Sequence, residues 1–436
     1  MLKYIDNILI NIKVKKVDLF LFSFISFFVG SLIIVKSDLI GSMSLIILAL
    51  ITFWFSRYYK SLTAILYVAL CVRLVVIYFG NFLLILPESL GDASQYEIYA
   101  WKFSQNGFFS VIDYFPAGRS SYNISWILAF FYSVTGRNII IAQSLSLFFG
   151  MGSVLLAALI ANKIWSKKIS IKVGWIIALY PSLVLYSSLI LREAYIWFFL
   201  LVAIYGIICW SKDKSFKSII IAFIGFGGAT FYHGGMIIGG FVFLCILLIT
   251  SSIEIIKRLS YLKISINSLA LLILSSIITF YLISSVDSIP KIGSIVGMFN
   301  AEQALEEISN RNINRAAFPE WTVPKTPAEL IYKAPIRVLY FIFSPFIWDV
   351  TEISHLFGMF DGMFFIMLFI LVIKNIKLIW SDPILRTIFI ILISYFVIFG
   401  LSTGNFGTGI RHRTKFLIVS ILLVAPWLPK LTFNKK

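Results

Sequence analysis

The chain has little charge and few residues of the kinds on which soluble enzymes depend. Only 13% of its 436 residues are charged, whereas about a quarter would be usual for a soluble protein. Its three cysteines all lie inside apolar runs and lack metal-ligand spacing, so they read as packing residues and exclude a disulfide scaffold. No glycine-rich phosphate loop or nucleotide-binding fold is evident. These shortages exclude a soluble globular enzyme.

Long apolar runs take the place of the missing polar residues. Hydrophobic residues make up 60% of the chain, and runs near or above about 18 apolar residues recur along its length. In lipid every backbone polar group must be paired within the protein, which leaves helix bundles or closed barrels. Because the runs are continuous rather than alternating, helices are favoured. The sequence predicts an all-α, polytopic transmembrane bundle that forms a single domain over residues 1–436.

We place about twelve spans, which bring both chain termini to one side of the membrane. Their approximate bounds are 19–36, 41–57, 62–87, 139–163, 172–190, 194–210, 218–233, 236–252, 264–284, 355–374, 385–402 and 414–429.

Lysine and arginine predict the orientation of these spans. With both termini in the cytoplasm, the short cytoplasmic loops carry the whole net charge of +17, and bases and acids elsewhere cancel. The excess is spread over several loops, so it is an orientation signal and not a nucleic-acid-binding patch. We therefore expect a multi-pass cell-membrane protein with no nucleic-acid partner.

Two segments on the predicted outer face are long, residues 87–138 and 285–354. The first contains interfacial helices, including an apolar stretch at 125–134 that is too short to span a bilayer. The second ends in a run that Pro345 breaks, which predicts a re-entrant or half-length helix. A transporter would place its polar residues at the bilayer midplane. The polar residues here concentrate on the outer face, which favours a site there.

Asp92 begins a predicted helix in the first outer segment. Asp92, Tyr96 and Ala100 are spaced four residues apart, so they share one helix face. Asp92 has two compatible interpretations. It can be an N-cap, a position that aspartate favours, or a surface carboxylate that takes a proton from an acceptor hydroxyl.

Charged residues also mark the spans themselves. Arg192 and Glu193 follow a span, and they either end one helix and start the next at the water interface or contribute to a site beside Asp92. Arg73 lies near the middle of the third span, as a functional residue or in an ion pair. His233 ends the seventh predicted span, where a tight outer turn explains it as well as a chemical role does. No cluster has metal spacing, so the sequence leaves open whether a divalent metal takes part.

The last predicted outer turn, residues 404–416, is basic on a face that should avoid positive charge. It contains three glycines and the group Arg411, His412, Arg413 and Lys415. One interpretation is a solvated loop. The other is a phosphate clamp, in which arginine forks and a lysine hold a phosphate and the glycines allow the backbone to approach it.

Several of these motifs, in this order, resemble the GT-C superfamily of integral membrane glycosyltransferases. They are Gly-Asp-x3-Tyr-x3-Ala at 91–100, an amphipathic stretch ending in Gly136-Arg137, a Tyr-Pro-Ser motif opening 180–188, and Leu-Arg-Glu at 191–193. The chain looks most like the branch with protein O-mannosyltransferases and lipid A aminoarabinose transferases. The resemblance covers residues 62–210 well and the rest in outline.

The resemblance implies a polyprenyl-phosphate sugar donor and an extracytoplasmic site. It gives Asp92 the role of base and matches Glu193 to a position where the family has an acid. Many members have a second acid beside the base, where this chain has Ala93.

The sequence thus predicts a glycosyltransferase that moves a sugar from polyprenyl phosphate to a glycan, lipid or protein acceptor. Asp92 is the predicted catalytic base. The predicted substrate-binding residues are Tyr96, Arg192, Glu193, Arg411, His412, Arg413 and Lys415. The alternatives are an O-antigen-type polymerase or ligase, which uses a lipid diphosphate, and a lipid or solute transporter.

Overall fold

The computed structural model describes residues 16–36, 38–115, 120–259, 301–311, 317–350 and 353–429, with the single positions 269, 273 and 276. Over these ranges the chain is α-helical, and its one β feature is an isolated bridge between Ala317 and Asn405. The chain forms two compact units. Unit 1 takes its described residues from 1–115, 124–155 and 174–191, and unit 2 from 116–123, 156–173 and 192–436.

The described residues contain eight helices long and apolar enough to cross a membrane. They are α2 (Lys16–Lys36), α3 (Leu39–Tyr58), α4 (Thr63–Phe82), α7 (Ile139–Ile164), α10 (Glu193–Asp213), α12 (Ile237–Leu259), α17 (Ile353–Lys374) and α19 (Pro383–Ser402). Each matches a predicted span. The chain is thus helical and multi-pass, as its apolar runs predict.

Four predicted spans differ from this set. The run at 218–233 forms α11 (Phe216–Tyr232), a shorter apolar helix, and the run at 414–429 falls within α20 (Phe406–Val424) and the turn after it. The span at 264–284 lies outside the described residues apart from three single positions. The run at 172–190 falls mostly within two helices with a bend between them, so a span there stays a prediction. The two helices are α8 (Lys167–Leu179) and α9 (Pro181–Ser188), and the bend between them is 59°. The count of twelve stays a prediction.

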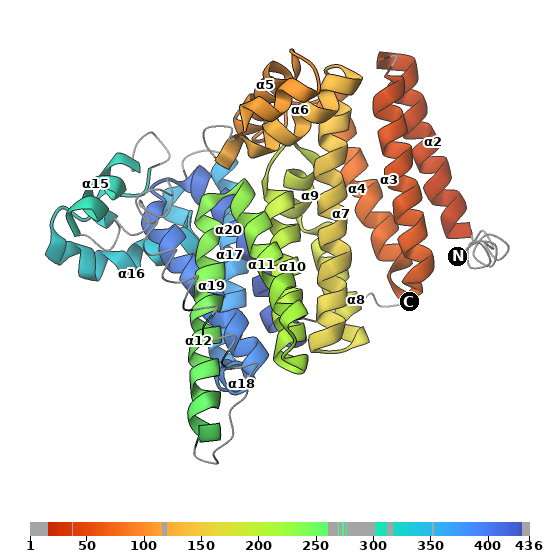
Figure 1. Ribbon diagram of the computed structural model, residues 1–436. Coiled ribbons are helices and arrows are strands. Elements are labelled where there is room, and N and C mark those ends of the chain that lie inside the picture. Colours follow the sequence, from red (N-terminus) through yellow and green to blue (C-terminus); the bar gives the residue numbers. More distant parts are fainter. Residues whose placement is uncertain are drawn as a thin grey trace. The chain divides into compact units, whose positions relative to one another are not determined.

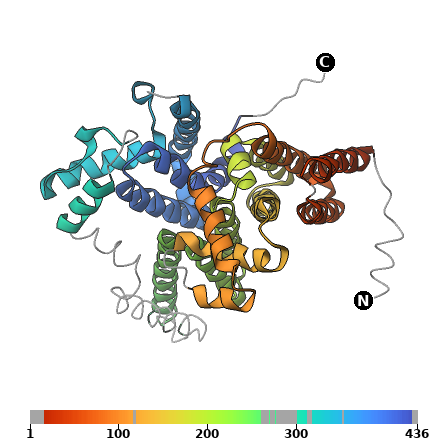
Figure 2. The same cartoon turned by 90° about the horizontal axis from the view of Figure 1, so that it is seen from above.

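In unit 1, α2, α3 and α4 pack as three neighbouring helices, drawn red to orange in Figures 1 and 2. A buried polar contact joins their ends. Asp18 of α2 accepts a hydrogen bond from the Tyr67 hydroxyl at 2.7 Å and pairs with Arg57 of α3. Because an unpaired carboxylate would be costly inside an apolar bundle, these partners make the burial of Asp18 tolerable.

Arg73 of α4 supports the break between α8 and α9. Pro181 cannot continue a helix, so the carbonyls before it lose their usual donors. The Arg73 guanidinium donates to the carbonyl oxygens of Ile177 at 3.3 Å and Ala178 at 2.9 Å, and to the Ser187 hydroxyl at 2.9 Å. The predicted ion pair is wrong, since the partners of this arginine are carbonyls and a hydroxyl.

Residues 87–138, the first segment predicted to lie on the outer face, belong to unit 1 except for 116–123. This segment contains α5 (Asp92–Ser104), the 3-10 turn η2 (Phe109–Tyr114) and α6 (Asn123–Thr135), which confirms a short apolar helix where the sequence predicts an interfacial one. Arg137 donates to both carboxylate oxygens of Glu97, at 2.9 and 2.7 Å, and so ties the end of α6 to α5. These hydrogen bonds raise the pKa of Arg137.

In unit 2, small residues bring α10 and α11 close together. Gly206 faces the backbone of Ala222, and Gly225 faces the backbone of Ala203. A Cβ on either glycine would collide with the other helix, as in membrane helix pairs with small residues at the interface. This contact sets α10 firmly in unit 2, with Glu193 at its first position.

The second outer segment is helical where it is described. It contains α15 (Ala301–Arg311), α16 (Pro327–Phe343) and the turns η6 (Glu320–Thr322) and η7 (Ile347–Asp349), drawn mainly in teal and light blue in Figure 2. Helix α16 ends directly before Ser344 and Pro345, which confirms the predicted break. It begins earlier than the run at 338–349 suggests.

Candidate functional site

The predicted basic turn at 404–416 is wrong, because the chain is already helical there. Helix α20 begins at Phe406, directly after Asn405, whose side chain accepts the backbone N–H of Thr408 at 2.8 Å. This N-cap starts the helix in spite of its two early glycines. All four basic residues therefore lie on a helix, where a spacing of two residues turns side chains to different faces.

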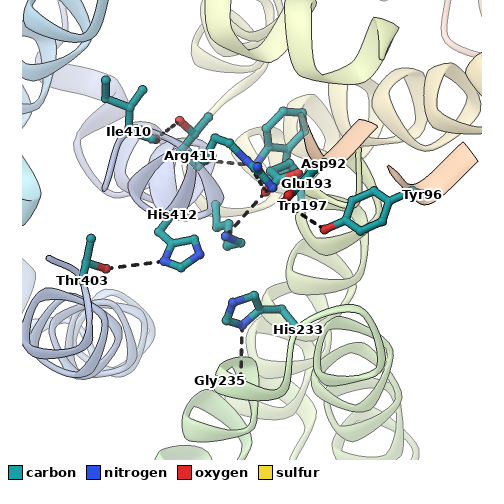
Figure 3. A network of polar contacts seen from close by, with 12 residues as sticks. Asp92, Tyr96, Glu193, Trp197, His233, Gly235, Thr403, Ile410, Arg411 and His412 are labelled. Atoms are coloured by element: carbon teal, nitrogen blue, oxygen red, sulfur yellow. Dashed lines mark hydrogen bonds and ion pairs between the residues drawn. The ribbon is translucent and has the colours of Figure 1, made fainter. Parts of the chain in front are cut away.

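Arg411 and Lys415 lie one turn apart on α20 and meet a single carboxylate. Arg411 donates to Glu193 Oε1 from Nη2 at 3.3 Å and from Nε at 3.4 Å. The Lys415 Nζ lies 3.6 Å from the same oxygen. Glu193 and Lys415 are fully buried and Arg411 is 9% exposed. We call Arg411, Lys415 and Glu193 the charged triad, of which Figure 3 labels Arg411 and Glu193.

One carboxylate oxygen of the triad accepts no hydrogen bond from the described residues. The second carboxylate oxygen of Glu193, Oε2, is buried and has no hydrogen-bond partner among the described residues. Arg192, next to it in sequence and 8% exposed, adds a further buried positive charge at the start of α10. The structure thus brings together three of the predicted binding residues, with Arg192 adjacent in sequence.

His412 points to another side of α20, toward His233. The two imidazole rings (Figure 3) lie 5.1 Å apart between centroids. Both rings contact the ring of Phe399. His233 ends α11, and its Nδ1 accepts the backbone N–H of Gly235 at 3.2 Å, which confirms the predicted turn. That bond leaves the proton of a neutral His233 on Nε2. The pairing with His412 could not be read from the sequence.

Arg413 is separated from the triad and is held by other partners. Its Nε lies 3.3 Å from Asp361 of α17, and its remaining donors reach the carbonyl oxygens of Ile342, Ser344 and Gly358. The side chain is completely buried. The structure therefore places Arg413 in a packing role, away from the carboxylate that Arg411 and Lys415 share.

We expect Arg413→Ala to destabilise the protein rather than to remove a substrate contact. Removing one partner of a buried ion pair typically costs about 3–5 kcal/mol. Heat- or detergent-induced unfolding of the purified protein measures this loss. The control is Lys325→Ala, whose 69% exposed side chain pairs with Glu320 at the surface and should contribute little. Equal stability of both variants would contradict a packing role for Arg413.

Asp92 begins α5 in unit 1, but it is not the N-cap. Gly91 is the N-cap residue, and Asp92 is the first helical residue. Its Oδ2 accepts a hydrogen bond from the Tyr96 hydroxyl at 3.2 Å, one turn further on (Figure 3). The shared face predicted for Asp92 and Tyr96 is confirmed, and the N-cap interpretation is wrong because this carboxylate turns toward the tyrosine.

Comparison of the chain with models of protein families, with curated proteins and with solved structures gave no match. In the described ranges, no three or more His, Cys, Asp or Glu side chains gather as a metal site requires, so no residue is assigned to a metal. Unit 2 contains the charged triad and the histidine pair, and unit 1 contains the Asp92–Tyr96 pair.

Proposed function

We propose that the protein is a membrane glycosyltransferase that moves a sugar from a polyprenyl-phosphate donor to an acceptor on the extracytoplasmic face. The observation that carries this proposal is the charged triad. Fixed charges are costly inside an apolar helix bundle and usually mark a functional site there. Two cations on one helix face suit a lipid phosphate, because arginine offers a planar fork and lysine a compact charge.

The proposed reaction assigns one role to Asp92 of unit 1 and another to the charged triad of unit 2. Asp92 takes the proton of the acceptor hydroxyl, and the acceptor oxygen attacks the anomeric carbon of the sugar with inversion. The bond from that carbon to the phosphate oxygen breaks, and polyprenyl phosphate leaves. Arg411 and Lys415 stabilise the charge that develops on the leaving phosphate. Glu193 holds these two cations, and its Oε2 can accept a hydrogen bond from the acceptor.

The lipid that copurifies with the protein tests the donor. Mass spectrometry of the extract is expected to detect a polyprenyl phosphate or its sugar conjugate, and wild-type protein should retain more of it than Arg411→Ala. A transfer assay with that lipid then identifies the sugar. The absence of any polyprenyl lipid, together with no transfer, would contradict the proposal.

Orientation is tested separately by cysteine labelling. After replacement of Cys71, Cys209 and Cys245 by serine, Leu90→Cys and Thr408→Cys, each at an exposed position, should react with an impermeant maleimide added outside the cell. Lys217→Cys, on a predicted cytoplasmic loop, should react only after the membrane is opened. Labelling of the first two from the cytoplasm alone would reverse the topology.

A transporter is the alternative from a different class, and the broken pair α8–α9 favours it, since broken helices often carry transport sites. Here, however, Arg73 already occupies carbonyls at the break. An O-antigen-type polymerase or ligase would use the same cations on a lipid diphosphate. Uptake by reconstituted vesicles without glycosyl transfer would favour the transporter.

A further inference from the structure

Arg337 of α16 differs from the other buried arginines of unit 2 and unit 1. Among the described residues, three arginines have side chains that are fully buried: Arg73, Arg337 and Arg413. Arg73 makes four hydrogen bonds, and so does Arg413. Arg337 makes one, from Nη2 to the carbonyl oxygen of Thr403 at 2.7 Å. Its Nε and Nη1 have no partner in the described part of the chain.

The Arg337 guanidinium carries a positive charge, and no acidic side chain in the described part of the chain pairs with it. No carboxylate in the described ranges forms an ion pair with Arg337. Glu329 pairs with Lys333 at 2.8 Å, Asp361 pairs with Arg413, and Asp349 accepts the backbone N–H of Phe346 at 3.0 Å. A buried charge without partners costs several kcal/mol, so a guanidinium that keeps three N–H groups unused calls for an acceptor.

The surroundings of Arg337 connect it to the histidine pair. Its guanidinium lies 5.8 Å from the ring centroid of Phe318, on the segment that pairs with the end of α19 through Phe318 N–H and the Gly404 carbonyl. Thr403, which accepts the Arg337 hydrogen bond, has its hydroxyl 3.5 Å from His412 Nδ1. Thr403 therefore contacts both Arg337 and His412.

We propose that Arg337 anchors an oxyanion-binding position at the C-terminal end of α19, where it receives a phosphate or carboxylate group through its Nε and Nη1 donors. This fork geometry fits a planar carboxylate or two phosphate oxygens. The Phe318 ring centroid lies 5.8 Å from the guanidinium, and Thr403, whose carbonyl accepts the Arg337 hydrogen bond, has its hydroxyl near His412. The proposal goes beyond the glycosyl transfer proposed above and does not depend on it.

The test measures how oxyanions stabilise the purified protein against heat, at constant ionic strength. Inorganic phosphate and pyrophosphate should raise the unfolding temperature of the wild type, as any ligand of the folded state does. Arg337→Met should weaken the apparent affinity about ten- to a hundredfold, the effect of losing a charge-assisted contact. Arg73→Met is the matched control: it should unfold at a lower temperature but keep the wild-type affinity for the anion.

Arg411→Ala separates this position from the triad. If both positions bind, each substitution removes its own part of the response, and the double variant loses both parts. An unchanged affinity in Arg337→Met overturns the present proposal, whereas the response of Arg411→Ala reports on the triad and leaves the present proposal untouched. Should Arg337→Met not fold, Arg337→Lys takes its place and should retain part of the affinity, because it keeps the charge without the fork.

The source of the oxyanion follows from three ligands. The position is tested first as the site of the second phosphate of a lipid diphosphate. In that case Arg337→Met should lower the affinity for farnesyl diphosphate and leave the affinity for farnesyl monophosphate unchanged. If the position binds the carboxylate of an acidic sugar, the variant should lower the affinity for glucuronate. The ratio of the affinities for the two farnesyl ligands should then stay unchanged. If Arg337→Met binds farnesyl diphosphate, glucuronate and inorganic phosphate with wild-type affinity, Arg337 is a packing residue that caps α19.

Discussion

Asp92→Asn is expected to lower the rate of sugar transfer by about 10²- to 10⁴-fold, the usual effect of losing a general base. The amide has the size of the carboxylate and can still accept the Tyr96 hydroxyl bond that holds it in the structure. It cannot take a proton from the acceptor. The measurement is transfer by purified protein at saturating donor.

Two variants control for this result. Asp113→Asn removes an exposed carboxylate from η2 in the same outer segment and should leave the rate unchanged. Tyr96→Phe removes the hydroxyl that bonds to Asp92 and should reduce the rate less, since the base itself remains. Full activity of Asp92→Asn would leave this carboxylate a helix-terminal charge, and the reaction would need another base.

Arg411→Ala is expected to weaken binding of polyprenyl phosphate by one to two decades and to slow transfer. A charge-assisted hydrogen bond contributes about 1.5–3 kcal/mol, and each 1.4 kcal/mol is tenfold in affinity. Arg411→Lys should restore only part of the affinity, because an ammonium lacks the planar fork. Lipid binding to single variants in nanodiscs measures the effect.

The partner residues sharpen this experiment. Lys415→Met should also lower the affinity for polyprenyl phosphate, because Lys415 and Arg411 both lie beside Glu193 Oε1. Arg413→Ala, two residues along α20, should lower stability while the folded fraction keeps its lipid affinity, because Arg413 contacts Asp361 instead. Wild-type affinity in both Arg411→Ala and Lys415→Met would remove the phosphate clamp and leave the triad a structural ion cluster.

Local sequence patterns predicted the features of the site that depend on local geometry. The four-residue spacing of Asp92 and Tyr96 placed them on one helix face, and their side chains do meet. The apolar run ahead of His233 and the two glycines after it indicated the turn that the structure has. The same reasoning failed at residues 404–416, where glycines suggested a loop but the Asn405 cap starts a helix.

Features that depend on distant partners were not accessible in this way. Arg411 and Glu193 are 218 positions apart, and Arg413 meets a carboxylate 52 positions away. A run of basic residues carries no mark of which member will meet which acid. The uneven hydrogen bonding of Arg337 was missed for the same reason, since its only described hydrogen-bond partner, Thr403, is 66 positions distant.

The sequence by itself determined that this chain is a multi-pass helical membrane protein. The length of an apolar run is a local property, and it can be compared directly with the length that a helix needs to span a bilayer. It also determined where charge had to be accommodated within that apolar protein. Only the tertiary structure decided how each charge is accommodated: Arg73 by the carbonyls of a broken helix, Arg413 by Asp361, and Arg411 and Lys415 by Glu193. The reason is that burial makes each charge dependent on partners from other helices, and their meeting is set by packing.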